Sequence, residues 1–314
     1  MITIKRYTNE ERTAWNNFVA TSKNGTFLLD RNYMEYHADR FNDYSLIAVN
    51  DKGKIVALLP ANINGSTLFS HQGLTYGGWI TQAKHFTVAE MLEVFDAMTA
   101  FLKENGIQSL VYKAIPHIYH RYPAEEDLYA LFRHNARLII SNVSTTIELN
   151  NPMAAYRSNT KLNIRKASKE GLTIEESEDY APYMQMLTEH LQEKYHTRPV
   201  HTAEEIQRLH NLFPNRIRLF TVRKDGRLVA GCVFYITDTV AHMQYSAMNE
   251  EGSRLYAVPF LHDYLIRTVF SGKRFYDFGI SNENNGRYLN EGLSFQKTGL
   301  GGRAIAYNIY QMDL

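Results

Sequence analysis

An internal repeat constrains the fold of this chain more than any other feature of its sequence. Residues 46–63 read LIAVNDKGKIVALLPANI, and residues 219–236 read LFTVRKDGRLVAGCVFYI. The two segments align without a gap at an offset of 173 residues and share six identical positions. Each predicts a strand, a turn at Gly53 or Gly226 and a second strand. The repeat therefore predicts two β-hairpins of the same kind, one in each half of the chain.

The segments around each hairpin also correspond. In the first half the sequence predicts helices over about 10–21, 31–41 and 87–104 and strands over 67–70 and 107–112. In the second half it predicts helices over about 179–195, 202–213 and 259–271 and strands over 240–247 and 274–278. Both halves thus have the order β-turn-β, β, loop, α, β, preceded by helices. Two copies of one α/β unit are the simplest account of this pattern.

A length of 314 residues fits two domains of roughly 150 residues each. We expect a first domain over residues 1–148 and a second over 149–314. A connector helix over about 152–170 opens the second domain, with Asn151 as its N-cap, Pro152 in its first turn and Gly171 at its end. The fold class expected is α/β, with layered α+β domains that each hold a mixed, mostly antiparallel sheet flanked by helices.

Composition excludes several classes of protein. The net charge of +1 predicts no chain-wide binding of nucleic acid, and the glycine patterns of common nucleotide-binding loops are missing. One cysteine, Cys232, rules out an intrachain disulfide framework and is expected to be a buried thiol. His117 and His120 lack the further ligands of a metal site, so no metal is expected. No apolar run reaches the roughly 20 residues of a membrane span, and no secretory signal is evident, so we expect a cytoplasmic protein.

Three segments in the second half point to a known family. Residues 159–171, NTKLNIRKASKEG, form a basic helix with an Ile-Arg-Lys-Ala stretch and a closing glycine. Residues 275–280, FYDFGI, are similar to a Tyr-Asp-Phe-Gly-Gly strand end. Residues 292–302, GLSFQKTGLGG, are similar to Gly-Leu-x-x-Phe-Lys-x-Gly-Phe-Gly-Gly and precede a predicted strand at 304–310. Together with the repeat, these segments resemble the Fem family of tandem GNAT-like acyltransferases.

The chain departs from the Fem pattern at several positions. Ile280 stands where a second glycine is common, Gln296 replaces a lysine, and Leu300 replaces an aromatic residue. Only two short helices are predicted over 179–213, where many Fem aminoacyltransferases have a long coiled-coil arm. A shorter group of GNAT-like acyltransferases, associated with polysaccharide and surface-polymer modification, has this reduced layout.

The resemblance implies an enzyme that transfers an acyl group, from acyl-CoA as the donor, to an amine of a sugar or peptide acceptor. Cell-envelope or polysaccharide modification is the setting that it implies. One alternative is peptidoglycan branching that depends on an aminoacyl-tRNA. A second alternative, from another class, is a non-catalytic protein that binds a phosphorylated glycan or peptide.

A basic stripe is expected on the connector helix. Arg157, Lys161, Arg165 and Lys169 recur every four residues, so a helix places them on one face. Such a stripe suits the phosphates of CoA, of a nucleotide sugar or of a tRNA end. The alternative is a solvated helix face without a ligand.

Two loops are candidates for binding. Around Tyr76, Gly77 and Gly78, glycines let backbone N–H groups approach an anion or a substrate, although a plain turn explains them equally well. The matching loop of the second half, residues 249–254, reads NEEGSR. By resemblance it should hold a donor pyrophosphate, but it lacks the usual Arg/Gln-x-x-Gly-x-Gly/Ala pattern, and its two glutamates would repel phosphate.

Acyl transfer to an amine needs a base, a donor for the developing oxyanion and an acid for the leaving group. Asp277 ends a predicted strand before a glycine-rich segment and is the candidate base; its alternative role is to cap that loop. Tyr245 and Tyr288 are candidate acids, or packed aromatic residues. Gln296 and Lys297 are implied as binding residues by the Fem-like segment alone.

Overall fold

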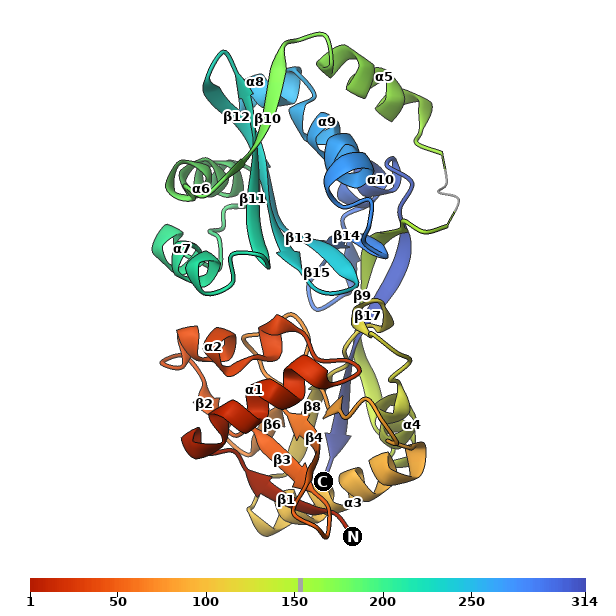
Figure 1. Cartoon of the computed structure of the whole chain (residues 1–314). Helices are drawn as coiled ribbons and strands as arrows, with labels where there is room; N and C mark the ends of the chain where they lie inside the picture. Colours follow the sequence, from red (N-terminus) through yellow and green to blue (C-terminus); the bar gives the residue numbers. More distant parts are fainter. Residues whose placement is uncertain (152–154) are drawn as a thin grey trace. The chain divides into compact units, whose positions relative to one another are not determined.

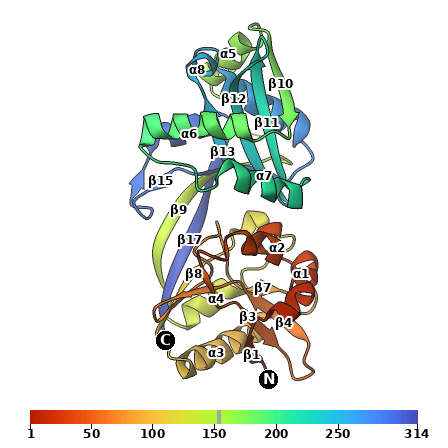
Figure 2. The same ribbon diagram turned by 90° about the vertical axis from the view of Figure 1, so that its left-hand side faces the viewer.

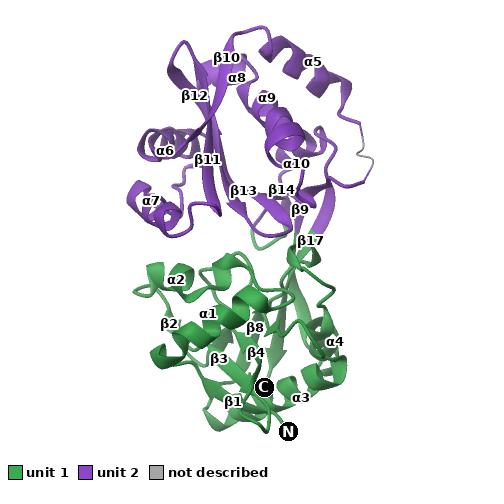
Figure 3. Cartoon of the chain, in the orientation of Figure 1, with its two compact units in different colours: residues 1–142, 284–287, 306–314 green, residues 143–283, 288–305 purple. Residues whose placement is uncertain are grey.

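A computed structural model of the chain describes residues 1–151 and 155–314, with the side chain of Tyr195 left out (Figure 1). The chain forms two compact units, which Figure 3 shows in green and purple. Unit 1 consists of residues 1–142, 284–287 and 306–314, and unit 2 of residues 143–283 and 288–305. This division differs from the boundary expected after residue 148, because the C-terminal strand pairs within unit 1.

The strands of unit 1 form two sheets. The first has the order β1-β3-β4-β7, with β1 Thr3–Arg6, β3 Leu46–Val49, β4 Ile55–Leu59 and β7 Ile80–Thr81. In the second, β17 Arg303–Asp313 pairs with β8 Ser109–Lys113, followed by β6 Thr67–Phe69, β5 Asn62–Asn64 and β2 Asn42–Asp43. The hairpin expected from the repeat is β3–β4, and Gly53 adopts φ +71° in its turn.

The helices of unit 1 are α1 Arg12–Thr21, α2 Arg31–Met34, α3 Val88–Glu104 and α4 Glu126–Arg133, with 3-10 turns at Asn9–Glu11, Phe27–Leu29, Glu35–His37 and His117–Tyr119. Helix α3 begins with a capping box formed by Thr87 and Glu90. The helix expected over 31–41 is wrong, since α2 is only four residues long. The chain tightens into a 3-10 turn there, where Nδ1 of His37 contacts the carbonyl of Met34 at 2.7 Å.

Unit 2 contains one sheet of the order β10-β11-β12-β13-β14-β9. Its strands are β10 Leu172–Ser177, β11 Ile217–Lys224, β12 Arg227–Ile236, β13 Val240–Met248, β14 Phe275–Ile280 and the part of β9 Arg137–Glu148 from residue 143 on. A short pair, β15 Asn282–Glu283 and β16 Tyr288–Leu289, stands apart. The second hairpin of the repeat is β11–β12, with Gly226 at φ +79° in its turn. Strands β13 and β14 pair in parallel, and the other neighbours are antiparallel.

The helices of unit 2 are α5 Ser158–Ala167, α6 Ala181–Tyr195, α7 Ala203–Leu212, α8 Glu250–Arg254, α9 Ala257–Tyr264 and α10 Glu291–Thr298; a π-helical turn, Leu265–Val269, continues α9. Helices α6 and α7 cover one face of the sheet and α9 the other (Figures 1 and 2). On the α9 face, Val229, Cys232 and Phe234 pack with Leu261 and Tyr276 in one apolar cluster. Cys232 is buried, as predicted, and burial raises the pKa of its thiol to about 12.

The connector helix is shorter than predicted. Helix α5 begins at Ser158 with Arg157 in the N-cap position, so Asn151 is not the cap. Pro152 lies outside the described residues. The helix ends at Ala167, and Gly171 adopts φ +66° before β10. In the part of the chain that the structure describes, no helix is long and apolar enough to cross a membrane.

The two copies of the repeat differ after their hairpins. In unit 2, β12 pairs directly with the third strand, β13. In unit 1, the strand is interrupted at Pro60, so that β4 pairs with β7 while β5 pairs with β6. Proline lacks the N–H that a continuous ladder needs. Only unit 2 therefore keeps an unbroken series of long strands beneath its helices.

Candidate active site

Four polar residues form a row across neighbouring strands of unit 2. Tyr235 of β12 is the register partner of His242 of β13. His242 is the partner of Asp277 of β14, and Asp277 is the partner of Thr146 of β9. All four side chains are buried. We call this set the polar row. Buried polar residues in the middle of a sheet are rare unless they bind each other or a ligand.

Asp277 and His242 form the centre of the polar row. Nδ1 of His242 lies 2.7 Å from Oδ2 of Asp277, whose carboxylate is fully buried. The hydroxyls of Ser144 and Thr146 donate to Oδ1, the latter at 2.6 Å. Burial on its own would raise the pKa of Asp277, but these hydrogen bonds and the charge of His242 lower it to about 2. Asp277 is therefore an anion at neutral pH, and its position orients the imidazole of His242.

The polar row lies where two parallel strands part. Strands β13 and β14 are paired over Val240–His242 and Phe275–Asp277, and β13 then continues to Met248 without β14. The pairing of β12 with β13 also shifts register here: Val233 faces Tyr245 and Phe234 faces Met243, so Gln244 is an extra residue. A bulge of this kind leaves a backbone group outside the ladder and re-aims the side chains that follow.

Tyr245 lies on the same sheet face as His242. Their partners on β12, Val233 and Tyr235, are two residues apart and so point to one face. The hydroxyl of Tyr245 lies 2.6 Å from Nδ1 of His201, and Nε2 of His201 lies 3.5 Å from the hydroxyl of Tyr235. Burial raises the pKa of Tyr245, while the backbone of His201 and the side chain of Gln244 oppose this. The sequence candidate Tyr245 thus contacts His201, the candidate Asp277 contacts His242, and Tyr235 and His242 are register partners between these two groups.

Lys297 lies near the polar row from the side of α10. Its Nζ donates to the carbonyls of Gly279 and Ile280, at 2.8 and 2.7 Å. Burial lowers the pKa of Lys297 to about 8, and the charge of Asp277 opposes that shift. Gly279 adopts φ +73° at the end of β14, a conformation that favours glycine. Lys297 therefore fixes the backbone of this strand end, whereas Gln296 beside it is exposed.

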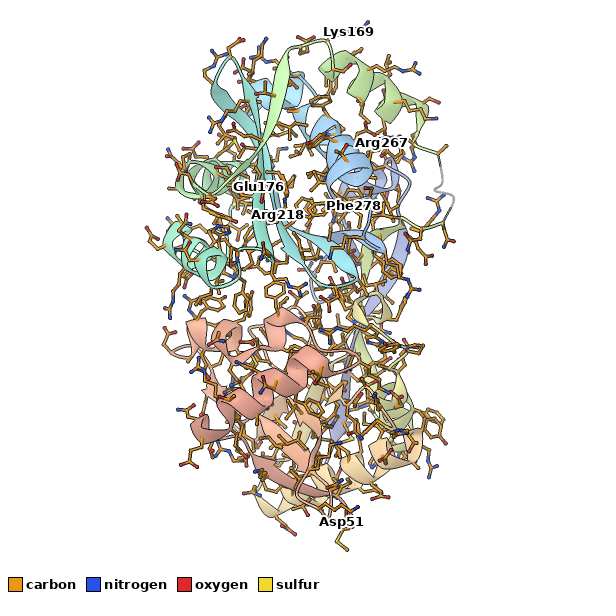
Figure 4. The ribbon with its side chains drawn as sticks, viewed as in Figure 1. Asp51, Lys169, Glu176, Arg218, Arg267 and Phe278 are labelled. Atoms are coloured by element: carbon orange, nitrogen blue, oxygen red, sulfur yellow. The ribbon has the colours of Figure 1, made fainter. Side chains whose placement is uncertain are left out.

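The predicted basic stripe is divided by the structure. Arg157 stacks on the ring of Phe295, with 3.7 Å from Cζ to the ring centroid, and donates to Thr298 of α10. Lys161, Arg165 and Lys169 are exposed, and their side chains form no hydrogen bond or ion pair with any described residue. Figure 4 shows Lys169 at the turn between α5 and β10. The outer part of the stripe is thus accessible to an anion, and Arg157 mainly attaches α5 to α10.

The acidic turn of residues 249–254, which contains α8, forms hydrogen bonds among its own groups. The side chain of Asn249 accepts from the N–H of Gly252, and the N–H of Ser253 binds the carbonyl of Asn249. A Cβ on Gly252 would lie 2.1 Å from the carbonyl oxygen of Val229, so close packing requires this glycine. Glu251 forms an ion pair with Arg227. The N–H groups of Gly252 and Ser253 are therefore occupied within this turn.

The glycine-rich loop of unit 1 is also tightly packed. A Cβ on Gly77 would lie 1.8 Å from the carbonyl oxygen of Ser70, and one on Gly78 would lie 2.7 Å from the hydroxyl of Tyr112. The N–H of Gly77 donates to the carbonyl of Lys113. Tyr76 is buried and donates to the hydroxyl of Thr26 at 3.0 Å. Packing within unit 1 explains these residues without a bound anion.

The remaining candidate, Tyr288, is 54% exposed in β16, opposite Glu283. Tyr245 is less exposed than Tyr288, and its hydroxyl contacts His201 in the segment before α7. Among the described residues, no group of three His, Cys, Asp or Glu side chains could hold a metal ion.

Sequence reasoning missed the two histidines of the site. His242 is part of a predicted strand, but its neighbour across the sheet depends on the register of β13 against β14. His201 lies just before the capping box of α7 and is 44 residues from Tyr245. The only local signal was a polar residue inside an apolar strand, which marks His242 as a buried group that needs a partner.

Comparisons with known proteins agree with this fold. Residues 154–288 match the family model of the acetyltransferase (GNAT) domain. No curated protein matches the sequence. The solved structure of FemX is similar with a TM-score of 0.71 at 11% identity, over 99% of this chain and 97% of that chain.

Two further structures are similar across nearly the whole chain. One is the C-terminal domain of a putative lysylphosphatidylglycerol synthetase from Agrobacterium fabrum, with a TM-score of 0.63 at 12% identity, over 97% of this chain and 92% of that chain. The other is a tandem GNAT protein from the clavulanic acid biosynthesis pathway, with a TM-score of 0.50 at 9% identity, over 100% of this chain and 98% of that chain. The resemblance expected from the sequence is confirmed: residues 154–288 match the GNAT acetyltransferase domain model, and the fold is similar to those of FemX and of a tandem GNAT protein.

Proposed function

We propose that unit 2 transfers an acyl group from an activated donor to an amine, with His242 as the base and Tyr245 as the acid. The observation that carries this proposal is the His242–Asp277 pair, buried at the point where β13 and β14 part. A proton on Nδ1 that binds Asp277 gives Nε2 the lone pair of a base. Asp277 itself is fully buried and bound on both oxygens, so we assign it the positioning of His242 and not the base.

The proposed reaction balances with these groups. The amine nitrogen forms a bond to the acyl carbon and gives its proton to Nε2 of His242. The bond from that carbon to the leaving group breaks, and Tyr245 gives its hydroxyl proton to the leaving atom. The bulge at Gln244 frees a backbone group beside both side chains, which supports a role in stabilising the developing oxyanion.

For the substrates, we propose an acceptor amine on a sugar or peptide and a phosphate-bearing partner near the exposed basic residues. Lys161, Arg165 and Lys169 extend along α5 and beyond it without intramolecular partners among the described residues. Basic side chains of this kind suit the phosphates of acyl-CoA or of a nucleotide sugar. Acyl-CoA is the donor that a GNAT domain favours.

A second candidate donor is an aminoacyl ester such as an aminoacyl-tRNA. The acidic turn at residues 249–254 favours it, because the N–H groups of Gly252 and Ser253 are occupied and two glutamates replace a phosphate-binding pattern. The fold likeness to FemX and to a lysylphosphatidylglycerol synthetase domain agrees with aminoacyl transfer. The pyrophosphate of acyl-CoA would need free backbone N–H groups in this turn, whereas an aminoacyl-tRNA would not. Measurements of donor binding therefore distinguish the two candidates.

The test combines calorimetry and turnover on the whole chain. Acetyl-CoA, CoA, lysyl-tRNA and uncharged tRNA are titrated separately, and labelled donors are then incubated with amino sugars and a UDP-sugar peptide. We expect one donor to bind and to acylate an amine, and His242→Gln to lower the rate by a factor on the order of 10² or more with donor affinity unchanged. His190→Gln is the matched control, since His190 lies on α6 and binds a backbone carbonyl.

Acyl transfer that His242→Gln leaves unchanged would refute the assigned base. Tight binding of a phosphorylated glycan without transfer from any donor would favour the non-catalytic alternative.

A further inference from the structure

We propose that Tyr235 and His201 form a proton relay that returns the proton from His242 to Tyr245 after each turnover. This inference rests on the proposed function, because it concerns the same base and acid. The chemical step leaves His242 with an extra proton and Tyr245 without one. A second turnover therefore requires one proton to move between these two groups or to be exchanged with water.

The bulge in β13 is the first observation behind the relay. Residues 242 and 245 are three apart, and in a regular strand an odd separation places side chains on opposite faces. The extra residue Gln244 reverses this, so that His242 and Tyr245 share one face. The bulge thus brings the base and the acid to one side of the sheet, on which Tyr245 contacts His201 just before α7.

His201 connects the two ends. It is 5% exposed, and its ring is held by the loop before α7, whose capping box is formed by Thr202 and Glu205. Its two nitrogens face two different hydroxyls: Nδ1 lies 2.6 Å from that of Tyr245, and Nε2 lies 3.5 Å from that of Tyr235. A histidine that only anchored α7 to the sheet would need a hydrogen bond to one of these two hydroxyls, not to both.

Tyr235 completes the line to the base. It lies directly opposite His242 in the pairing of β12 with β13, where side chains on one face are about 5 Å apart at Cβ. Tyr235 is 2% exposed, so bulk water does not reach its side chain freely. The groups therefore follow the order Asp277, His242, Tyr235, His201 and Tyr245.

The relay neither gains nor loses a proton. His201 transfers its Nδ1 proton to the phenolate of Tyr245. Tyr235 transfers its hydroxyl proton to Nε2 of His201, and His242 transfers its Nε2 proton to the oxygen of Tyr235. Every group is then neutral except Asp277, with protons again on Tyr245 and on Nδ1 of His242. Exchange with water restores the starting tautomer of His201: Nδ1 takes up one proton and Nε2 releases one, so the count stays balanced.

The experiment removes one hydroxyl from the relay. Tyr235→Phe keeps the size of the side chain but eliminates proton transfer between His242 and His201. Tyr180→Phe is the matched control: Tyr180 is also buried in unit 2, and its hydroxyl contacts a histidine, Nδ1 of His210, at 3.2 Å. Both variants are compared with wild type by nitrogen-15 NMR of the histidine rings and by the turnover assay.

We expect Tyr235→Phe to change the ring signals of both His201 and His242, and Tyr180→Phe to change neither. In turnover, Tyr235→Phe should lower kcat on the order of tenfold with KM unchanged. Added imidazole buffer should restore part of this loss by carrying the proton from solution. A structural defect would instead alter KM or stability and would not respond to buffer.

The two readouts separate failure of the relay from failure of the proposed function. A His242 signal that Tyr235→Phe leaves unchanged overturns the relay, whether or not the chain is active. Turnover that depends on His242 but is equal in Tyr235→Phe and Tyr180→Phe also overturns it, and leaves the proposed function intact. Coupled NMR signals in a chain that acylates no amine would support the connection and refute the proposed function.

Discussion

Replacing Asp277 with asparagine tests the electrostatics of the polar row. The carboxylate is fully buried and accepts hydrogen bonds from His242, Ser144 and Thr146. Its pKa is lowered from 3.8 to about 2. Linkage converts this difference into about 2 kcal/mol of folding stability at pH 7. Because the folded-state pKa lies below the unfolded value, this stability is complete above about pH 5 and is lost as the pH falls through about 4 to 2.

Asp277→Asn should therefore lower the free energy of unfolding by about 2 kcal/mol at pH 7, and the difference from wild type should shrink by about 1 kcal/mol at pH 3. Urea unfolding followed by circular dichroism at several pH values between 7 and 3 measures both quantities. Asp238→Asn is the control, because Asp238 pairs with Arg216 at the surface and such a pair contributes about 1 kcal/mol or less.

The same variant reports on the orientation of His242. Asparagine presents a donor nitrogen on one side and an acceptor oxygen on the other. With the nitrogen toward His242, Nδ1 becomes an acceptor and its proton moves to Nε2; with the oxygen toward His242, the tautomer stays as it is. Nitrogen-15 NMR distinguishes the two tautomers. A stability difference that stays constant from pH 7 to pH 3 would refute the charged, buried state of Asp277. A Nδ1 signal of His242 that is the same in wild type and Asp277→Asn would refute the assigned hydrogen bond.

Two further substitutions test packing and burial. Gly77→Ala places a Cβ against the carbonyl of Ser70, so we expect it to lower the free energy of unfolding by at least about 2 kcal/mol. The control is Gly272→Ala, which has open space around it and should change the free energy of unfolding by less than about 0.5 kcal/mol. Equal melting temperatures of the two variants would contradict the packing explanation of Gly77. Lys297 has a folded-state pKa of about 8, which is below its unfolded value. Its protonation therefore destabilises the folded state at neutral pH, and this cost disappears as the pH rises. Between pH 7 and pH 10 the free energy of unfolding of wild type should increase by about 2 to 3 kcal/mol relative to that of Lys297→Met. Urea unfolding across that range checks this, and parallel pH profiles of the two proteins would show that Lys297 is not buried as a cation.

Local signals predicted much of the fold. The hairpins at Gly53 and Gly226 formed with the turn glycines at positive φ, and α3 began at its capping box. The segment over 31–41 failed as a long helix, since a 3-10 turn replaces its second half. The start of α5 was also misplaced, since the helix begins at Ser158 with Arg157 in the N-cap position.

The candidate site was predictable only in part. Asp277 and Tyr245 were named from the ends of predicted strands, and the structure links them through residues that carry no motif. Tyr288 and Gln296 proved exposed, and Lys297 proved buried against the backbone. The exposure of a side chain and its hydrogen-bond partners depend on which other helices and strands cover it. The hydrophobic periodicity of one segment does not predict which elements those are.

The sequence by itself determined that the chain holds two copies of one α/β unit, because hydrophobic period, turn glycines and helix caps act within about a dozen residues. Only the tertiary structure decided which residues come together in the candidate active site. The polar row requires the register of four strands, in which Ser144 binds Asp277 from 133 residues away. A one-residue bulge then brings Tyr245 to the face of His242. Register and bulges are set by the packing of whole strands against each other, and no single segment encodes them.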